Sequence, residues 1–240
     1  MGSKPLLALA ISMLCAGAGA GQAEIVFIAP TNHSMPLAGF DNGTLSAGII
    51  KDLGDAIALG LGRKARYVNV PSRRVSRFLS SGQADGLCYV LPHWIPGQFD
   101  WSAPLVANAS VIVARSDAPA VAAFGQLADR AVGTVSGYDY PQLDAALGAR
   151  FVRDDAPSMD LMLRKLLAGR SQYAVVDKAT LDYHVRADAA SRLRVDLVFG
   201  QYMARCAFSR QSQVPFAQVE HVIQGLLDDG SVQRILLRYR

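Results

Sequence analysis

Short apolar runs alternate along the chain with stretches in which hydrophobic residues return every three or four positions. The first pattern is typical of buried β-strands and the second of amphipathic helices, so their alternation predicts an α/β protein. Ser72 is expected to cap one of these helices. The first ninety residues predict the order strand, helix, strand, helix, strand, at residues 24–29, 47–62, 65–70, 72–82 and 85–91.

The same order returns in the second half of the chain. In each half a helix ends on a glycine, Gly82 or Gly169, just before a buried strand. We therefore expect two lobes of similar build, each a mainly parallel sheet flanked by helices. The second series consists of a strand, turn and helix at 130–148, a short segment at 150–153, a helix at 158–169 and a strand at 172–177.

Two further strands, at 109–115 and 202–209, connect the two series, and the tail at 214–239 predicts two helices with an apolar side. Strands that cross twice between lobes form hinges, expected near 105–109 and 201–205, and such hinges allow a cleft to close on a ligand. The expected division is lobe 1 at residues 24–107, lobe 2 at 108–202 and a return to lobe 1 at 203–240.

The N-terminal residues 1–23 have the layout of a secretory signal peptide. Lys4 precedes an apolar run of about ten residues, which is too short to span a bilayer, and a tail of small residues follows. Cleavage is expected after Ala23, with Ala20 as the alternative, and a lipid anchor at Cys15 is not expected. These features predict an exported protein, and the natural compartment is a bacterial periplasm.

Composition excludes several classes of function. The chain has 24 Lys and Arg against 20 Asp and Glu, an excess too small and too scattered to predict a nucleic-acid partner. The sequence contains no phosphate-binding loop, and no cofactor is expected. It also contains no nucleophile elbow, the motif of one class of hydrolytic enzymes. The spacing of the four histidines, His33, His93, His184 and His221, predicts no metal site.

Cys88 and Cys206 are the cysteines that remain once a signal peptide is removed. Export permits a disulfide between them. Both lie inside apolar, strand-like runs, where a free cysteine behaves as a small buried hydrophobe, so we expect two free thiols, with a disulfide as the alternative.

Six phrases of the sequence, taken in order, carry a family resemblance. They lie at residues 43–62, 78–91, 99–105, 130–140, 166–185 and 225–239. In this order and spacing they resemble the family 3 periplasmic solute-binding proteins across essentially the whole chain after residue 23. The resemblance implies a two-lobed type II periplasmic-binding fold, which holds a small polar molecule in its cleft and whose closure is recognised by a membrane transporter or a sensor receptor.

The resemblance also implies which residues meet the ligand, and here the sequence departs from the family. Ile95 occupies the place of the arginine that grips a ligand carboxylate, Val90 the place of a threonine, and Ser34 the place of a stacking aromatic residue. Asp177 stands where the family holds a ligand ammonium group. Gly137 lies in a loop that presents backbone N–H groups to an anion.

An arginine at a new position offers a replacement for the missing one. Residues 71–74 resemble the Pro-x-x-Arg phrase of a divergent branch of the family, which places Arg74 at the start of a cleft-facing helix. Arg74, or Arg73 beside it, would grip an anion together with free N–H groups of the first turn. The alternative is that both arginines are solvated on the helix surface.

These observations predict a binding protein, not an enzyme, that closes on an anionic or zwitterionic molecule and acts as a monomer. Asp177 ends a buried strand, where open α/β sheets bind ligands, although an aspartate there also caps helices well. The other hypotheses are a ligand-sensing module for a signalling receptor and a dehydratase-like enzyme that uses Asp177 with His33 or His93. The expected ligand-binding residues are Arg74, Asp177, Gly137, Tyr138, Ser136, Ser34, Ser72, Tyr89 and Trp94.

Overall fold

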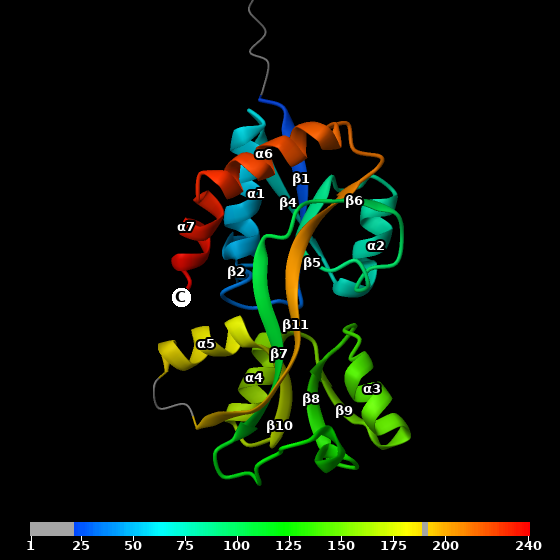
Figure 1. Ribbon diagram of the computed structural model, residues 1–240, viewed down its shortest axis with the longest axis vertical. Helices are drawn as coiled ribbons and strands as arrows, with labels where there is room; N and C mark the ends of the chain where they lie inside the picture. Colours follow the sequence, from blue (N-terminus) through cyan, green and yellow to red (C-terminus); the bar gives the residue numbers. More distant parts are fainter. Residues whose placement is uncertain (1–21, 189–191) are drawn as a thin grey trace, which may run out of the picture.

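The computed structural model describes residues 22–188 and 192–240, and it places them in two lobes joined by two long strands (Figure 1). The expected signal peptide, with the alternative cleavage site at Ala20 and with Cys15, lies outside the described residues except for residues 22 and 23, which include the preferred cleavage site at Ala23. The two-lobed α/β arrangement predicted from the sequence is present. Within the described ranges, none of the helices is long and apolar enough to cross a lipid bilayer.

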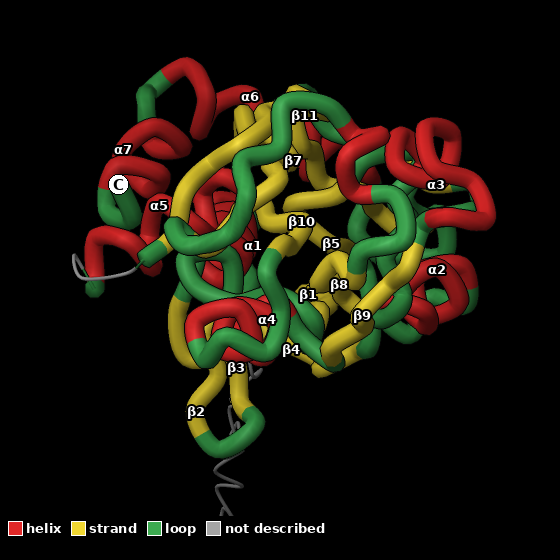
Figure 2. The backbone as a smooth tube through the Cα atoms, turned by 90° about the horizontal axis from the view of Figure 1, so that it is seen from below, coloured by secondary structure: helices red, strands yellow, loops and turns green. Residues whose placement is uncertain are grey.

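Lobe 1 is built around a central strand, β1, which pairs in parallel with a neighbour on each side. The helices between these strands cover the sheet and bury their apolar side chains against it, as their spacing predicts. A small hairpin, β2–β3, projects from the body of the molecule (Figure 2). The elements are β1 (Glu24–Pro30), β2 (Gly39–Asp41), β3 (Thr44–Ala47), α1 (Ile49–Gly60), β4 (Lys64–Val70), α2 (Ser72–Ser80), β5 (Gly86–Val90) and β6 (Phe99–Trp101).

Lobe 2 repeats this construction. Strand β8 pairs in parallel with β9 on one side and β10 on the other, and two hydrophobic clusters fill the space between sheet and helices. The carboxyl end of β10 faces lobe 1. The elements are a 3-10 turn (Phe124–Leu127), β8 (Ala131–Val135), α3 (Pro141–Leu147), a 3-10 turn (Gly148–Arg150), β9 (Val152–Ala156), α4 (Met159–Leu167), β10 (Tyr173–Asp177) and α5 (Lys178–Ala187).

The two connecting strands, β7 (Val106–Arg115) and β11 (Leu193–Ser209), form an antiparallel pair that runs from the middle of the molecule along lobe 2, and β11 continues into lobe 1 (Figure 1). They unite the sheets in the order β4-β1-β5-β11-β7-β10-β8-β9, and β6 also pairs with β11. The lobe boundaries expected at residues 107 and 202 fall inside this pair. Each strand is longer than its apolar run predicts, and β11 begins nine residues earlier.

The C-terminal helices α6 (Phe216–Asp228) and α7 (Ser231–Leu237) return to lobe 1, as the apolar side of the tail predicts. Val219 and Ile223 of α6 join the core that α1 covers. Tyr239, just after α7, donates a 3.0 Å hydrogen bond to Asp52 and accepts one from the N–H of Gly48. The end of the chain is thereby attached to the start of α1.

Cys88 and Cys206 form a disulfide, so the expectation of two free thiols is wrong. The two residues lie directly opposite each other on the antiparallel strands β5 and β11, with 3.9 Å between their Cα atoms. The apolar runs correctly predicted burial, since both side chains are almost fully buried. Burial does not exclude pairing, however, and which strands lie side by side depends on a contact between residues 118 positions apart.

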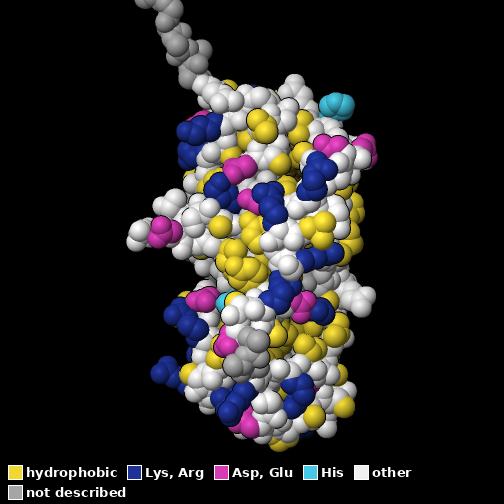
Figure 3. All heavy atoms as spheres, turned by 90° about the vertical axis from the view of Figure 1, so that its left-hand side faces the viewer, with side chains coloured by type: hydrophobic (Ala, Val, Ile, Leu, Met, Phe, Trp, Pro, Cys, Tyr) yellow, Lys and Arg dark blue, Asp and Glu magenta, His cyan; other side chains and the backbone are white. Residues whose placement is uncertain are grey.

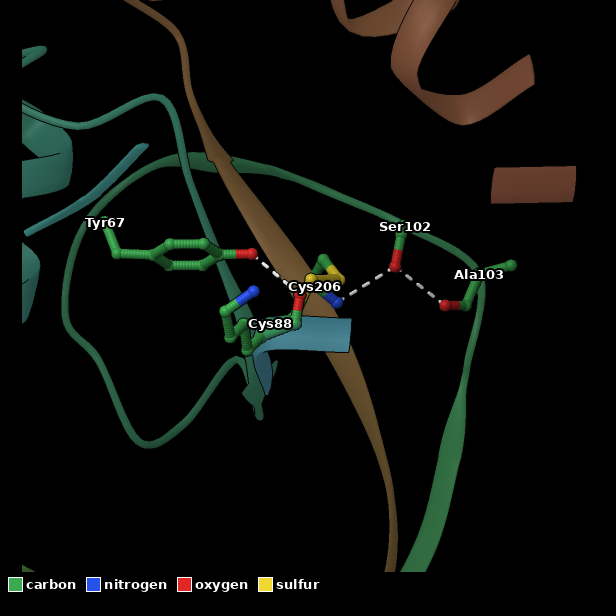
Figure 4. The surroundings of a disulfide bond; sticks show 6 residues. Tyr67, Cys88, Ser102, Ala103 and Cys206 are labelled. Atoms are coloured by element: carbon green, nitrogen blue, oxygen red, sulfur yellow. Dashed lines mark hydrogen bonds between the residues drawn. A yellow bond between two sulfur atoms is a disulfide. The ribbon is translucent and has the colours of Figure 1, made fainter. Parts of the chain in front are cut away.

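The disulfide is held on one side by a hydroxyl group (Figure 4). Ser102 accepts a 2.9 Å hydrogen bond from the N–H of Cys206 and donates one of 2.8 Å to the carbonyl oxygen of Ala103. Ser102 is fully buried, and these bonds satisfy its hydroxyl in both roles. The disulfide joins β5 to β11 at Cys88, the residue directly before Tyr89 in the chain.

A candidate ligand-binding cleft between the lobes

A cavity of about 200 Å³ lies between the two lobes. Its walls come from the loop between β1 and β2 (residues 31–38, the first cleft loop) and from α2 of lobe 1, from the loop after β8 and the end of β10 in lobe 2, and from the crossing strand β11. Because each lobe supplies part of the wall, a molecule inside the cavity would touch both. The aromatic residues of the wall are Tyr89, Trp94, Tyr138, Tyr140, Phe199 and Tyr202.

Asp177 is the buried carboxylate of this cavity, with 9% of its surface exposed. It ends β10, and the chain enters α5 immediately after it. Tyr202 donates a 2.7 Å hydrogen bond to Oδ1, and Tyr89 Oη lies 3.4 Å from Oδ2. Burial raises the pKa of Asp177 to about 6, although the hydrogen bonds from Tyr202 and Tyr89 oppose this shift.

Tyr89 links the cavity to the crossing strand β7. Its φ of +66° lies in the left-handed region, which is rare for a bulky residue and costs of the order of 1–3 kcal/mol. Its hydroxyl accepts a hydrogen bond from Asn108 of β7 and lies 3.0 Å from the hydroxyl of Tyr202. Asn108 in turn accepts a 3.1 Å bond from the N–H of Ala179 in α5. Burial, followed by the charge of Asp177, raises the pKa of Tyr89, so the phenol stays neutral.

The aromatic rings form a connected group along one wall. The ring of Trp94 lies 5.2 Å from that of Tyr202 and 6.4 Å from that of Tyr89, measured between centroids. Tyr89 also contacts His33 edge-to-face at 5.7 Å, and His33 contacts Tyr138 at 6.0 Å. Separations in this range are those at which aromatic pairs stabilise one another. The wall therefore offers ring faces and edges to a ligand.

His33 and Tyr138 form a hydrogen bond between the lobes. The Tyr138 hydroxyl lies 3.0 Å from Nδ1 of His33. Burial lowers the pKa of His33 to about 4, so the imidazole is neutral at pH 7. The same burial, and then the charge of Asp177, raises the pKa of Tyr138. This contact is therefore a bond between two neutral groups.

Asn32 forms the second connection between the lobes. Its side-chain N–H groups donate to the carbonyl oxygens of Ser136, at 3.2 Å, and Pro157, at 2.9 Å, both in lobe 2. Its backbone oxygen accepts a 2.9 Å bond from the N–H of Met159. These contacts connect the first cleft loop of lobe 1 directly to lobe 2.

The prediction that Ser72 caps α2 is wrong, and the Asn32 side chain takes the role of a cap. Ser72 is the first residue of the helix and not its cap, which is Pro71. The N–H and the hydroxyl of Ser72 both donate to Asn32 Oδ1, at 2.8 and 3.0 Å. Asn32 thus supplies the acceptor that a capping side chain would otherwise provide.

Six of the nine residues expected to bind a ligand line the cavity: Asp177, Gly137, Tyr138, Ser72, Tyr89 and Trp94. Arg74, Ser34 and Ser136 are not among the described residues that line it. Arg74 is exposed, with its guanidinium 5.4 Å from the ring of Phe78, one helical turn further on. Ser34 is buried, and the carbonyl oxygen of Ser136 accepts a hydrogen bond from Asn32.

Arg73 lies at the rim, against the glycine loop of lobe 2. A Cβ atom added to Gly137, whose φ is +84°, would lie 2.9 Å from Cγ of Arg73. Gly137 therefore allows the close approach of the two lobes as well as the shape of its own loop.

Sequence reasoning missed Asn32, Asn108 and Tyr202. Asn32 lies in the first cleft loop beside His33, so a polar amide in that loop was the available signal. Asn108 and Tyr202 lie on the crossing strands, and their role depends on how those strands pair. Their registry, Tyr202 opposite Asn108, brings both toward Asp177.

A second hollow, of about 830 Å³, lies behind the crossing strands, between α5 and α7. Its walls include Val106, Val198 and Met203, and the last two are about half exposed. Hydrophobic side chains gather at mid-height on this face of the molecule (Figure 3).

Among residues 22–188 and 192–240, no group of three or more His, Cys, Asp or Glu side chains is placed to hold a metal ion.

No family model and no curated protein matches the sequence. Solved structures do match the fold. An ancestral arginine-binding protein bound to arginine has a TM-score of 0.75 at 19% identity, over 91% of this chain and 98% of that one. The arginine-, lysine-, histidine-binding protein ArtJ from Geobacillus stearothermophilus has a TM-score of 0.76 at 17% identity, over 90% and 94%.

A third similar structure is an ancestral amino-acid-binding protein described as a precursor of cyclohexadienyl dehydratase. Its TM-score is 0.75 at 17% identity, over 90% of this chain and 95% of that one. At these identities the likeness establishes the fold. The chain has the two-lobed type II periplasmic-binding fold, which confirms the fold implied by the sequence resemblance.

Proposed function

We propose that the protein is an exported solute-binding protein of the family 3 type, which captures a small polar molecule between its lobes and delivers it to an ABC-type membrane transporter. The observation that carries this proposal is Asp177, a buried carboxylate in a cavity whose walls come from both lobes. A charged group of this kind needs a polar ligand to compensate it. The similar structures, which include amino-acid-binding proteins, support the same role.

Capture requires that the lobes separate and close. In the closed arrangement, Asn32 and His33 hold lobe 2 through hydrogen bonds to Pro157 and Tyr138. β7 and β11 are the connections about which the lobes would open. A ligand that binds the closed state more tightly than the open one shifts the population toward closure, and this shift is what a membrane partner recognises.

We propose binding without chemical turnover, by a periplasmic monomer. An enzyme of the dehydratase type would need an acid and a base on either side of the ligand. Asp177 has a pKa suited to that task, but His33 is already engaged by Tyr138, and its pKa of about 4 makes it a weak base near pH 7. A sensor role in place of transport would use the same cleft, and the two differ only in the membrane partner.

The proposal is tested by thermal shift and small-angle X-ray scattering on the mature protein, with amino acids, amines, organic acids and sugars as probes. A ligand at a hundred times its dissociation constant should add about 2.7 kcal/mol to the free energy of unfolding. The same ligand should reduce the radius of gyration. A protein whose melting temperature and dimensions stay constant with every probe would not be a solute-binding protein of this kind.

A further inference from the structure

The cavity carries negative charge with no positive charge to balance it. Among the described residues that line it, none is a lysine or an arginine. Two cations lie close to the wall without lining it. Arg73 is exposed at the rim beside Gly137. Arg153 is engaged elsewhere: its N–H groups donate to the carbonyl oxygens of Tyr138 and Val135 and to Asp155. Asp177 is the buried charge of the cavity, since the other lining carboxylate, Asp139, is exposed.

Asp177 has acceptor capacity left over. A carboxylate offers about four acceptor positions, and hydrogen bonds from Tyr202 and Tyr89 use at most two. The ion pairs of the described part of the chain involve other residues, so the charge of Asp177 has no cationic partner. A buried, uncompensated carboxylate is unfavourable, and a cation that enters the cavity would relieve this cost.

The wall beside Asp177 suits a cation with an apolar body. Tyr89, Trp94 and Tyr202 lie with ring centroids 5.2 to 6.4 Å apart, and two of these residues also approach the carboxylate through their hydroxyls. Aromatic faces attract ammonium groups through their quadrupoles, most strongly where water is excluded. The ring faces and the carboxylate would therefore act on the same ammonium group.

The cavity offers no comparable place for a ligand carboxylate. Ile95, which stands where the family resemblance implied a carboxylate-binding arginine, lines the cavity and is 7% exposed. Arg74, the expected replacement, lies over Phe78 outside the wall, and Arg73, the alternative, is exposed at the rim and does not line the cavity. A carboxylate in this cavity would lose water to an apolar side chain and would be repelled by Asp177.

We infer that the cleft binds a small organic cation, with an ammonium group and an aromatic or apolar body but without a carboxylate, and that its ammonium group contacts Asp177 and the ring faces of Tyr89, Trp94 and Tyr202. This inference rests on the proposed function and names its class of ligand. It replaces the anionic or zwitterionic ligand expected from the sequence, because that expectation depended on Arg74.

Matched pairs of compounds that differ by one carboxylate provide the test. The probes are tyramine and tyrosine, agmatine and arginine, histamine and histidine, and choline and glycine betaine. Binding is measured by calorimetry and by the fluorescence of Trp94 in a Trp101→Phe background, since the chain has two tryptophans. In at least one pair the amine should bind at least tenfold more tightly than its carboxylated partner and should change the Trp94 emission.

Two variants identify the site. Asp177→Asn should weaken binding of that amine at least fiftyfold, whereas Asp182→Asn should leave it unchanged, because Asp182 is an exposed partner of Lys178 on α5. Circular dichroism and the melting temperature establish that both variants are folded. Trp94→Phe, which keeps a ring, should bind more tightly than Trp94→Leu.

The outcomes separate the inference from the proposed function. If the amino acid of every pair binds as tightly as its amine, or if only organic acids or sugars bind, the cation inference is wrong and solute capture stands. If amine binding survives Asp177→Asn within threefold, the inference is also wrong. If no compound of any class binds or changes the shape of the protein, the proposed function fails and the inference fails with it.

Discussion

Tyr202 donates a 2.7 Å hydrogen bond to Asp177, and this bond joins the crossing strand β11 to the end of β10 in lobe 2. The hydroxyl of Tyr202 also lies 3.0 Å from that of Tyr89, which belongs to lobe 1. One carboxylate is therefore in contact with a strand of the hinge and, through it, with the other lobe. A ligand that changes the charge or position of Asp177 therefore acts on the group that links lobe 1, lobe 2 and strand β11.

Asp177→Asn should stabilise the ligand-free protein while removing ligand binding. The folded pKa of about 6 lies above the ordinary value of 3.8, so the folded state holds this proton more tightly than the unfolded chain does. Stability is therefore lost as pH rises from about 4 to 6, and the cost above pH 6 is about 3 kcal/mol. Asparagine cannot ionise, so the free energy of unfolding at pH 7.5 should rise by about 1–3 kcal/mol.

Chemical denaturation at pH 7.5 and pH 3.5 measures this effect. Most of the gain from Asp177→Asn should disappear at the lower pH, where the wild-type carboxyl is protonated in the folded state and largely protonated in the unfolded state. An equal gain at both pH values would show that burial of the charge is not its origin. Asp182→Asn, on the exposed surface of α5, is the control and should change stability by less than about 0.5 kcal/mol.

Gly137→Ala should weaken ligand binding by obstructing closure. Its φ of +84° makes any side chain unfavourable, and the added Cβ would meet Cγ of Arg73 at 2.9 Å across the lobes. Gly148→Ala in the same lobe is the matched control, since its φ is +52° and its Cβ would meet nothing within 4 Å. Both variants pay the cost of an L residue at positive φ, which is of the order of 1–3 kcal/mol.

The two glycine variants should therefore lose similar stability, but Gly137→Ala should bind ligand about tenfold more weakly than Gly148→Ala. Adding Arg73→Ala to Gly137→Ala should recover most of that loss. Titration calorimetry measures both differences. Equal affinities in the two single variants would mean that contact between Gly137 and Arg73 does not limit closure.

The sequence predicted the cores of both lobes more completely than the strands that connect them. β10 reads as a continuous apolar run because both of its faces are buried, and α4 reads as a helical stripe because it buries one face. The first half of β11 was missed for a physical reason. Its register shifts between Val195 and Leu197 and again between Phe199 and Gln201, so its side chains do not alternate with a constant period of two.

The disulfide should contribute substantially to stability. It closes a loop across a separation of 118 residues, for which the loss of unfolded-state entropy amounts to roughly 4–5 kcal/mol. A Cys88→Ala, Cys206→Ala double variant should therefore unfold at a markedly lower denaturant concentration. A chain that begins at Glu24, oxidised and unfolded in denaturant, should present no thiol to a thiol reagent, and two after reduction. Two reactive thiols before reduction would contradict the pairing.

The site was predictable where it depended on one segment of chain. Asp177 was identified because it ends a buried strand, and Tyr138 because it follows a glycine in a strand-to-helix turn. Arg74 was predicted to bind the ligand because it lies near the start of α2. The side of α2 that lines the cavity carries Ser72 and Val75, and Arg74 lies on a different side of the helix. Tyr202 reaches Asp177 only through strand pairing, which no local pattern encodes.

Asn32→Ala should weaken binding through closure and not through ligand contact. It removes two hydrogen bonds to lobe 2, at Ser136 and Pro157, and the acceptor for the first turn of α2. At about 1 kcal/mol for each bond, the apparent affinity should fall about tenfold to a hundredfold. Scattering in saturating ligand should show a larger radius of gyration than for wild type.

Asn69→Ala is the control for this variant, because the Asn69 side chain bonds to Gly43 within lobe 1. It should leave both affinity and shape unchanged. An Asn32→Ala protein that binds and closes like wild type would show that these bonds contribute nothing to the equilibrium between open and closed states.

Ligand binding should weaken as pH falls through 6. A cationic ligand binds the ionised form of Asp177, whose pKa in the ligand-free cleft is about 6, so protons compete with it below that value. The groups that face the carboxylate, Tyr89, Tyr138 and Tyr202, have raised pKa values and stay neutral, and His33 protonates only near pH 4. The association constant for the best amine should therefore be constant above pH 7 and fall about tenfold per pH unit below 5.5. An anionic ligand would give the opposite slope, with tighter binding at low pH, so calorimetry between pH 5 and 8 distinguishes the two charges directly.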